Sequence, residues 1–133
     1  MNVLVDTSVW SLALRRSSPS GDPARAELEQ LVLDTRAVII GPIRQEILSG
    51  IKSDKQFDLL RDRLHAFPDI PLTKNDYEEG ARFFNLCRRK GIQGSNTDFL
   101  ICAVAARLKI PIFTTDQDFK HFGSVIPIAL HSY

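Results

Sequence analysis

The sequence predicts an α/β fold, a three-layer sandwich around a central, mainly parallel sheet of four to five strands. Short apolar runs rich in β-branched residues alternate along the chain with segments of helical periodicity. These runs are apolar on both faces, as in parallel strands that helices cover on both sides. The length of 133 residues is the usual size of one domain, so we expect a single domain over residues 1–133.

Five runs have strand character, and they cover residues 2–5, 37–40, 69–72, 110–113 and 125–130. The run at 69–72 is the weakest of the five. Pro127 lacks an amide hydrogen, so the last run is expected at an edge of the sheet. Strands that alternate with helices imply right-handed crossovers, and ligands of such sheets bind beyond the carboxyl ends of the strands.

Six helices are expected between these runs, and they cover residues 7–16, 23–34, 42–49, 54–64, 74–90 and 98–109. Asp22, Ser53 and Thr73 have the residue type and position of N-caps. The last of the six helices is apolar nearly all round, which predicts burial, and Asn96 or Thr97 is expected to cap it.

Two details of the long helix after Thr73 are also expected. Its apolar face should include Tyr77, Ala81 and Phe84 and extend to Cys87, because these residues follow helical spacing. Gly91 should end the helix, since glycine is the residue most often found after a helix C-terminus.

Acidic residues follow the expected strands at the edge where their carboxyl ends meet. Asp6 ends the first strand, and Asp116 and Asp118 follow the strand at 110–113. Glu46 lies one turn into the helix after the second strand, and Asp98 lies in the first turn of the apolar helix. All five carboxylates are therefore expected at one edge of the sheet.

Carboxylates this close together repel, by roughly 4 kcal/mol for two charges about 4 Å apart at an effective dielectric of 20. Either some of their pKa values rise, or cations lie between the oxygens. Carboxylate oxygens are the ligands that Mg²⁺ and Mn²⁺ prefer, and no cluster of His and Cys indicates zinc. The pattern therefore predicts one or two Mg²⁺ or Mn²⁺ ions acting on a phosphate ester.

Each acid also has an ordinary explanation when it is taken alone. Asp6, Asp98, Asp116 and Asp118 all stand where acids favour a helix N-terminus. Glu46 would ordinarily be a solvated helix residue. These explanations lose weight together, because they do not account for the gathering of all five at one edge.

Charge and cysteine content limit the classes of partner and the compartment. Seventeen Lys and Arg residues against sixteen Asp and Glu residues give a net charge of +1, so no global field attracts nucleic acid or a membrane. The two cysteines, Cys87 and Cys102, have no metal-ligand spacing and make no disulfide framework. The lack of a disulfide framework favours a reduced, cytoplasmic setting. No apolar run is long enough to cross a bilayer, and no membrane partner is expected.

Contacts to a nucleic acid would have to come from local basic clusters. The candidates for such contacts lie at the C-terminal ends of two expected helices, and they are Arg15, Arg16, Arg88, Arg89 and Lys90. The last three have an equally good alternative explanation, because cations are favoured at a helix C-terminus by the helix dipole.

Four motifs together carry a resemblance to a known family. They are Val5-Asp6-Thr7-Ser8, Glu46 after a strand, Thr97-Asp98-Phe99-Leu100-Ile101, and Phe113-Thr114-Thr115-Asp116-Gln117-Asp118-Phe119. In this order and spacing the chain resembles a PIN domain, in particular the VapC ribonuclease toxins of bacterial toxin–antitoxin modules. The resemblance covers essentially the whole chain and implies the PIN-like form of the α/β sandwich.

The resemblance also implies roles for individual residues. Asp6, Glu46, Asp98 and Asp116 match the acids that hold the metal ion in that family, and Asp118 matches a further acid whose role varies. The polar residues beside them, which would orient the carboxylates or a water molecule, are Thr7, Ser8, Asn96 and Thr114.

The activity implied by the resemblance is metal-dependent endoribonuclease cleavage that leaves 5′-phosphate ends, with transfer RNA as one plausible substrate. The implied partners are a cognate antitoxin and a second copy of the chain, with Leu28, Leu31, Leu59 and Leu60 as apolar candidates for contact surfaces. A non-catalytic RNA-binding or scaffolding PIN protein and a metal-dependent DNA nuclease remain as alternatives. A receiver module is disfavoured, because it needs an acidic pair where the first strand offers Asp6 followed by Thr7.

Overall fold

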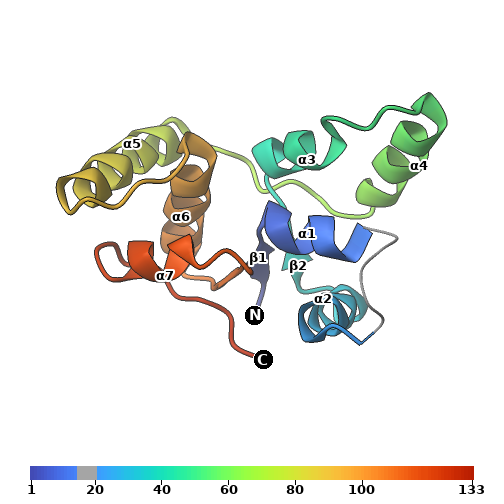
Figure 1. The fold of residues 1–133 in the computed structure, drawn as a ribbon, viewed down its shortest axis with the longest axis horizontal. Coiled ribbons are helices and arrows are strands. Elements are labelled where there is room, and N and C mark those ends of the chain that lie inside the picture. Colours follow the sequence, from blue (N-terminus) through green and yellow to red (C-terminus); the bar gives the residue numbers. More distant parts are fainter. Residues whose placement is uncertain (15–20) are drawn as a thin grey trace.

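The computed structural model describes residues 1–14 and 21–133, so the expected RNA contacts Arg15 and Arg16 lie outside the described residues. The elements follow one another in the order β1 (Val3–Val5), α1 (Thr7–Leu14), α2 (Pro23–Leu33), β2 (Ala37–Val38), α3 (Gly41–Leu48), α4 (Asp54–Leu64), α5 (Lys74–Arg89), α6 (Asn96–Leu108), β3 (Ile112–Phe113) and α7 (Asp118–Gly123) (Figure 1).

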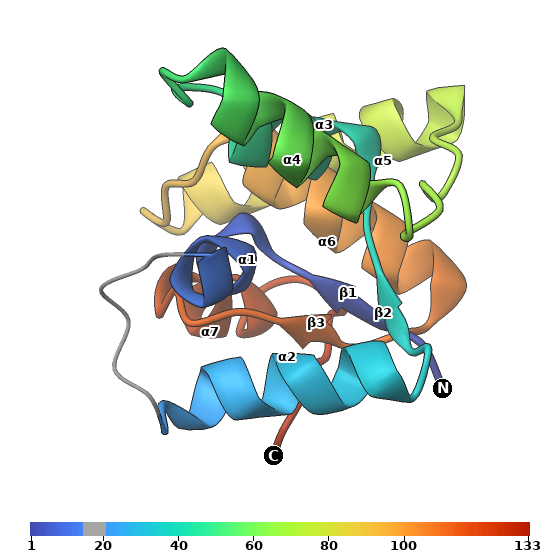
Figure 2. The same cartoon turned by 90° about the vertical axis from the view of Figure 1, so that its right-hand side faces the viewer.

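The sheet lies in the middle of the molecule and is parallel, in the order β2-β1-β3. In β1, Val3 pairs with Ala37 of β2, and Leu4 pairs with both Val38 and Ile112. Figure 2 shows α2 on one side of the sheet and α5 and α6 on the other. The predicted three-layer α/β fold is therefore confirmed, and the carboxyl ends of the strands point toward the start of α1.

Two of the five predicted strands do not form. Residues 69–72 and 125–130 are each reduced to one parallel bridge, Ile39 to Asp69 and Ile112 to Leu130. Pro127 lacks the amide hydrogen that would continue the ladder on one edge, and on the other edge the chain that pairs with 69–72 leaves the sheet for α3 at Gly41. Both bridges lie at the outer edges of the sheet, so the edge position expected for 125–130 was right and the expected length of pairing was wrong for both runs.

The core surrounds β1 and α6. All three residues of β1 are inaccessible to solvent, and the seven consecutive residues Phe99–Ala105 of α6 are buried. Phe119 and Phe122 of α7 are fully buried as well. The prediction of a buried apolar helix is confirmed, and burial on this scale supplies the main stabilisation of the fold.

Helix α5 buries a face shifted by one residue from most of the predicted one, and Cys87 belongs to both. Its buried residues are Asp76, Gly80, Phe83 and Cys87, whereas Tyr77 is 56% exposed. Gly80 faces the backbone of α6, and a Cβ there would lie in ordinary contact, 3.5 Å from backbone atoms of Leu100. Asp76 can be buried because Arg107 of α6 pairs with it at 2.7 Å.

The predicted helix starts are mostly confirmed. Asp22, Ser53 and Thr73 each accept a backbone hydrogen bond at the start of α2, α4 and α5. The cap of α6 was predicted wrongly: it is Ser95, which forms a reciprocal capping box with Asp98. Gly91 follows α5 with a φ of 75°, as a left-handed helix-ending residue does.

The four leucines proposed as contact candidates differ in their surroundings. Leu28 and Leu31 are buried in the core, Leu60 is partly buried against it, and Leu59 is 53% exposed. Leu28 and Leu31 therefore belong to the core and are not available for contact with a partner. Within the described ranges, no helix has the length and apolar character needed to span a membrane.

Candidate active site

The ends of β1 and β3 bring Asp6 and Thr114 together. Asp6 is the first residue after β1 and is only 6% exposed. Its Oδ2 atom accepts hydrogen bonds from the hydroxyls of Ser8 and Thr114, each at 2.8 Å. Two donors on one oxygen fix the orientation of this carboxylate, because any rotation would break both bonds.

The loop after β3 places Asp116 through the same hydroxyls. Oγ1 of Thr114 accepts the Asp116 N–H at 3.0 Å, and Oγ of Ser8 accepts the Thr115 N–H at 3.2 Å. Oδ1 of Asp116 in turn accepts the Asp118 N–H at 2.9 Å. Ser8 and Thr114 therefore position both Asp6 and the backbone that carries Asp116.

The first turn of α6 places Asp98. Its Oδ2 accepts the Ser95 N–H at 3.1 Å, while its own N–H donates to the Ser95 hydroxyl at 3.1 Å. The pKa of Asp98 is raised, first by burial and then by the negative charges of Asp6 and Asp116, although the bonds from Ser95 act in the opposite direction. Carboxylates from three separate parts of the chain therefore share one electrostatic environment.

Each of the three aspartates uses one carboxylate oxygen within the protein and keeps the other free. The engaged atoms are Oδ2 of Asp6, Oδ2 of Asp98 and Oδ1 of Asp116. The second oxygen of each accepts no hydrogen bond from residues 1–14 or 21–133. The protein thus orients these carboxylates and leaves one oxygen of each available to bind a metal ion.

The donor set fits a hard divalent cation. In the described ranges, no three His, Cys, Asp or Glu side chains lie close enough to enclose a metal ion directly. That is the usual situation for Mg²⁺, which keeps several water ligands and contacts only one or two carboxylates. The negative charges of Asp6 and Asp116, which help to raise the pKa of Asp98, are charges that such a cation would neutralise.

Glu46 comes from a further element, α3. It is exposed on α3 and makes no hydrogen bond or ion pair with a described residue. Its helix is held firmly, because Arg44 donates to the carbonyls of Leu64 and Phe67 and to the carboxylate of Asp69. The backbone position of Glu46 is therefore fixed while its side chain is free to turn.

The remaining predicted neighbours divide into two kinds. Ser8 and Thr114 bond to Asp6, as described above. Oγ1 of Thr7 is buried and has no hydrogen-bond partner among the described residues. Asn96 is exposed at the first turn of α6 and lines the same hollow as Pro42. In the described ranges, neither the Thr7 nor the Asn96 side chain donates a hydrogen bond to one of the three carboxylates.

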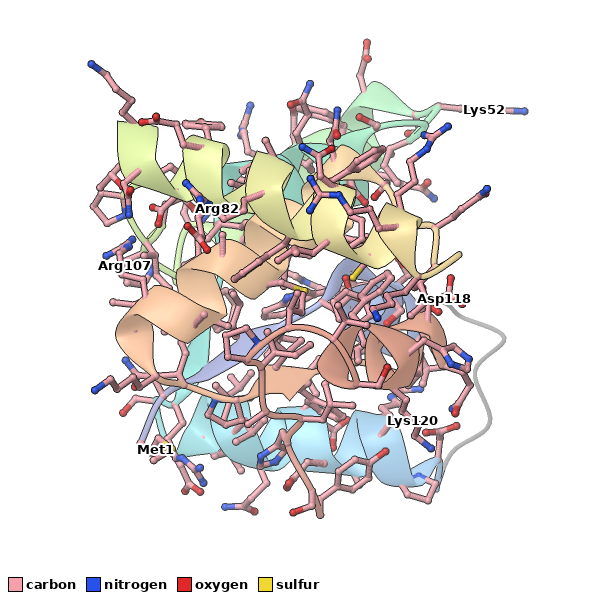
Figure 3. The ribbon with its side chains drawn as sticks, turned by 90° about the vertical axis from the view of Figure 1, so that its left-hand side faces the viewer. Met1, Lys52, Arg82, Arg107, Asp118 and Lys120 are labelled. Atoms are coloured by element: carbon pink, nitrogen blue, oxygen red, sulfur yellow. The ribbon has the colours of Figure 1, made fainter. Side chains whose placement is uncertain are left out.

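Asp118 and the basic cluster lie at the same end of the molecule. Asp118 is exposed at the start of α7, and Figure 3 shows it at the end of the molecule that also holds the last turn of α5. Arg88, Arg89 and Lys90 form that last turn and are all exposed. Of these three, Arg88 has its guanidinium 6.0 Å from the centre of the Phe84 ring.

Ser95 is the residue that sequence reasoning missed. It is the N-cap of α6, and its two bonds set the direction of Asp98. The signal was present in the sequence, since Ser95-Asn96-Thr97-Asp98 has the spacing of a capping box, with Asp in place of the usual Glu or Gln.

Comparison with known proteins agrees with this architecture. The family model of the PIN domain matches residues 3–125. FitAcB from Neisseria gonorrhoeae has a TM-score of 0.77 and 20% identity, over 98% of this chain and 96% of that chain. VapBC2 from Rickettsia felis, bound to a DNA fragment from its promoter, has a TM-score of 0.75 and 19% identity over 100% and 99% of the two chains.

A toxin–antitoxin complex from Klebsiella pneumoniae has a TM-score of 0.68 and 21% identity, over 99% of this chain and 98% of that chain. At these identities the structures establish a shared fold. No curated protein matches the chain significantly by sequence.

Proposed function

This chain belongs to the PIN domain family, and from that premise we propose that it is a metal-dependent endoribonuclease and the toxin of a type II toxin–antitoxin pair. PIN domains are generally nucleases, and its structural neighbours include toxin–antitoxin complexes. In this proposal residues 1–133 act as one nuclease domain, in the cytoplasm, where RNA and antitoxin are found. Transfer RNA is the first substrate to examine.

One observation carries the proposal. Asp6, Asp98 and Asp116 come from three parts of the chain, and each presents one free oxygen while the other is held by the protein. A cluster of like charges destabilises the folded protein, and a divalent cation bound between the carboxylates would offset this cost. Carboxylates oriented in this way are suited to such a cation. We assign Asp6, Asp98 and Asp116 as the metal ligands, directly or through water, with Glu46 completing the site and Asp118 as a further ligand.

The chain's own residues contribute positioning and charge. Ser8 and Thr114 hold Asp6 rigid, and Ser95 holds Asp98, so little reorganisation is needed when a substrate arrives. Glu46, with its free side chain, is available to orient an attacking water molecule. One or two Mg²⁺ or Mn²⁺ ions, when bound, would supply activation of that water and stabilisation of charge on the phosphoryl oxygens.

Water as the nucleophile determines the products. Attack on phosphorus breaks the bond to the 3′-oxygen, which leaves with a proton as a 3′-hydroxyl, and the new oxygen stays on the phosphate as a 5′-phosphate end. The 2′-hydroxyl of RNA takes no part in this step. A cyclic phosphate product would therefore contradict the proposed chemistry.

The direct test is cleavage of total cellular RNA by the purified protein, with Mg²⁺ or with EDTA. We expect discrete fragments with 5′-phosphate ends that appear only with the metal and disappear in Asp98→Asn. Single-stranded and duplex DNA are assayed in parallel, because preferential cleavage of DNA would replace the RNase assignment. A folded wild-type protein that binds Mg²⁺ and cleaves neither nucleic acid would favour the non-catalytic alternative.

The proposed antitoxin would recognise the same carboxylates. A cationic side chain that reaches the free oxygens of Asp6, Asp98 and Asp116 would offset their repulsion in place of the metal. We expect such an inhibitor to compete with Mg²⁺, so that its apparent affinity falls as the Mg²⁺ concentration rises.

A second copy of the chain is the other proposed partner. Beside the start of α6 lies an apolar hollow of about 310 Å³ whose lining includes Pro42, Leu100 and the exposed Tyr77. A homodimer formed there would cover the one large aromatic side chain that α5 leaves in solvent. Sedimentation analysis of Tyr77→Glu is expected to give a monomer where the wild type gives a dimer.

A further inference from the structure

A separate pocket opens at the C-terminal end of α5. It has a volume of about 260 Å³, and its lining consists of Phe84, Arg88, Ile92, Gln93, Gly94 and Phe99. None of these residues belongs to the carboxylate site described above. The pocket nevertheless adjoins that site along the chain, because Phe99 directly follows Asp98 and the loop at 92–94 leads into Ser95.

The walls of this pocket combine an aromatic surface with a cation and an amide. The Phe84 ring is only partly buried, and it meets the buried Phe99 ring edge-on at 5.6 Å. Arg88, one turn further along α5, places its guanidinium 6.0 Å from the centre of the Phe84 ring. Gln93 is exposed at the rim and carries both a hydrogen-bond donor and an acceptor.

The loop that closes the pocket is held in one conformation. The Ile92 N–H donates to the Cys87 carbonyl at 2.9 Å, and the Gly91 N–H donates to the Arg88 carbonyl at 2.9 Å. Gly94 is packed so tightly that a Cβ there would lie 2.5 Å from Cζ of Phe122. The pocket is therefore formed before any ligand arrives, which lowers the entropic cost of binding.

We propose that this pocket binds one unpaired nucleobase of the substrate, stacked on Phe84, with Gln93 reading the edge of the base and Arg88 contacting the adjoining phosphate. The proposal rests on the proposed nuclease function, since it concerns how that site selects its substrate. Stacking on an aromatic side chain together with a nearby arginine is the ordinary chemistry by which proteins hold single-stranded nucleic acid.

The composition of the lining favours a nucleobase over an apolar peptide side chain. An apolar side chain would gain nothing from Gln93 and would lie against the charge of Arg88. A base uses all three features, because its face stacks on a ring, its edge forms hydrogen bonds and its phosphate carries negative charge. Arg89 and Lys90, exposed beside Arg88, supply further positive charge for the backbone of the strand.

The first test needs no catalysis. Nucleoside 5′-monophosphates of all four bases are titrated in EDTA into isotopically labelled protein, and chemical shifts are followed at Gly94, Gln93, Arg88 Nε and the Phe84 ring. Ribose 5-phosphate, which has the sugar and phosphate but no base, is the control ligand. We expect at least one nucleotide to shift these signals and ribose 5-phosphate to leave the Phe84 ring unchanged.

Matched variants separate stacking and charge from general damage. Phe84→Leu keeps apolar volume but removes the aromatic face, and Phe57→Leu makes the same change at a partly buried position of α4. We expect Phe84→Leu to weaken nucleotide binding at least about fivefold, the lower end of measured stacking effects, and Phe57→Leu to leave it unchanged. Arg88→Ala should weaken binding as well, whereas Arg82→Ala on the same helix should not.

The outcomes distinguish this inference from the proposed function. Binding of no nucleotide, equal shifts at the Phe84 ring with ribose 5-phosphate, or unchanged binding in Phe84→Leu would each overturn the base pocket, whether or not the protein cleaves RNA. A second readout applies if cleavage is found. Phe84→Leu should then lower kcat/KM at sites with the preferred base by at least about fivefold and flatten the preference, and an unaltered preference would overturn the inference while leaving the nuclease intact.

Discussion

The hydroxyl of Thr114 donates a 2.8 Å hydrogen bond to Oδ2 of Asp6, although the two residues are 108 positions apart in the chain. This bond joins the ends of two neighbouring parallel strands, β1 and β3. Because Thr114 also accepts the Asp116 N–H, one side chain sets the positions of two of the three clustered aspartates. The geometry of the site thus depends on a residue that is not itself a ligand.

Thr114→Val keeps the shape of the side chain and removes both of these hydrogen bonds. We expect Mg²⁺ affinity or cleavage to fall roughly 10- to 100-fold, the usual effect of removing a residue that orients a metal ligand. Isothermal titration with Mg²⁺ and the RNA cleavage rate measure this change. Thr115→Val is the matched control, since Thr115 is exposed and uses only its backbone in the network, and equal behaviour of the two variants would contradict the assignment.

Asp98→Asn is expected to stabilise the metal-free protein while abolishing its function. The substitution removes one of three repelling charges, yet it keeps an oxygen that can accept the Ser95 N–H. In EDTA the variant should therefore melt at a higher temperature than the wild type, and its cleavage rate should be lower by at least about 100-fold.

Added Mg²⁺ should reverse that order of stability. Binding at 100 times the dissociation constant adds about 2.7 kcal/mol to the free energy of unfolding of the wild type, whereas Asp98→Asn should gain little. Thermal denaturation with and without Mg²⁺ measures both effects. An equal gain in the two proteins would place the metal elsewhere.

Glu46→Gln tests whether Glu46 takes part in the site. Since Glu46 is exposed and has no described partner, the melting temperature should not change, whereas cleavage should fall by roughly 10- to 100-fold. Gln45→Ala, at the neighbouring exposed position of α3, is expected to leave both quantities unchanged. Full activity of Glu46→Gln would remove Glu46 from the site.

The ion pair between Asp76 and Arg107 gives a prediction about stability alone. Burial by itself would raise the pKa of Asp76, but the bonds from Arg107 and Thr73 outweigh it, and the pKa lies below the ordinary value of 3.8. Arg107 is at the far end of the molecule from Asp118, as Figure 3 shows. Arg107→Met should therefore lower the free energy of unfolding by about 3 kcal/mol at pH 7 without changing Mg²⁺ affinity.

The pH dependence follows from the sign of this shift. A carboxylate with a lowered pKa stabilises the folded state above its ordinary pKa, and this contribution is lost as the pH falls through the lowered value. Urea denaturation at several pH values should show the difference between wild type and Arg107→Met shrinking as the pH falls toward and below 3.8, because burial raises the pKa of Asp76 once Arg107 is removed. Arg82→Met breaks only an exposed pair with Glu79 and should have little effect.

The strands and helices could be predicted largely because their signals are local. Apolar β-branched runs marked β1, β2 and β3, and residues with capping side chains marked the starts of α2, α4 and α5. The misplaced elements depend on long-range contacts. The buried face of α5 is set by Arg107, which makes burial of Asp76 tolerable, and by Leu100, against which Gly80 packs.

The candidate site, too, could be predicted only in part from the sequence. Topology alone placed Asp6 and Asp116 at one edge, because parallel strands end together. Which oxygen of each carboxylate is occupied depends on hydroxyls from distant parts of the chain, and spacing could not reveal that. The position of Glu46 likewise depends on how Arg44 fixes α3 against the chain at 64–69.

The location of a bound divalent ion is the most direct test that Asp6, Asp98 and Asp116 form one metal site. Substoichiometric Mn²⁺ broadens the NMR signals of nearby nuclei, so titration into labelled protein locates the ion. We predict that the amide signals of Asp6, Ser8, Asp98 and Asp116 disappear first, and that excess Mg²⁺ restores them. Broadening that begins instead at the exposed acids of α4, Asp58 and Asp62, would contradict the account.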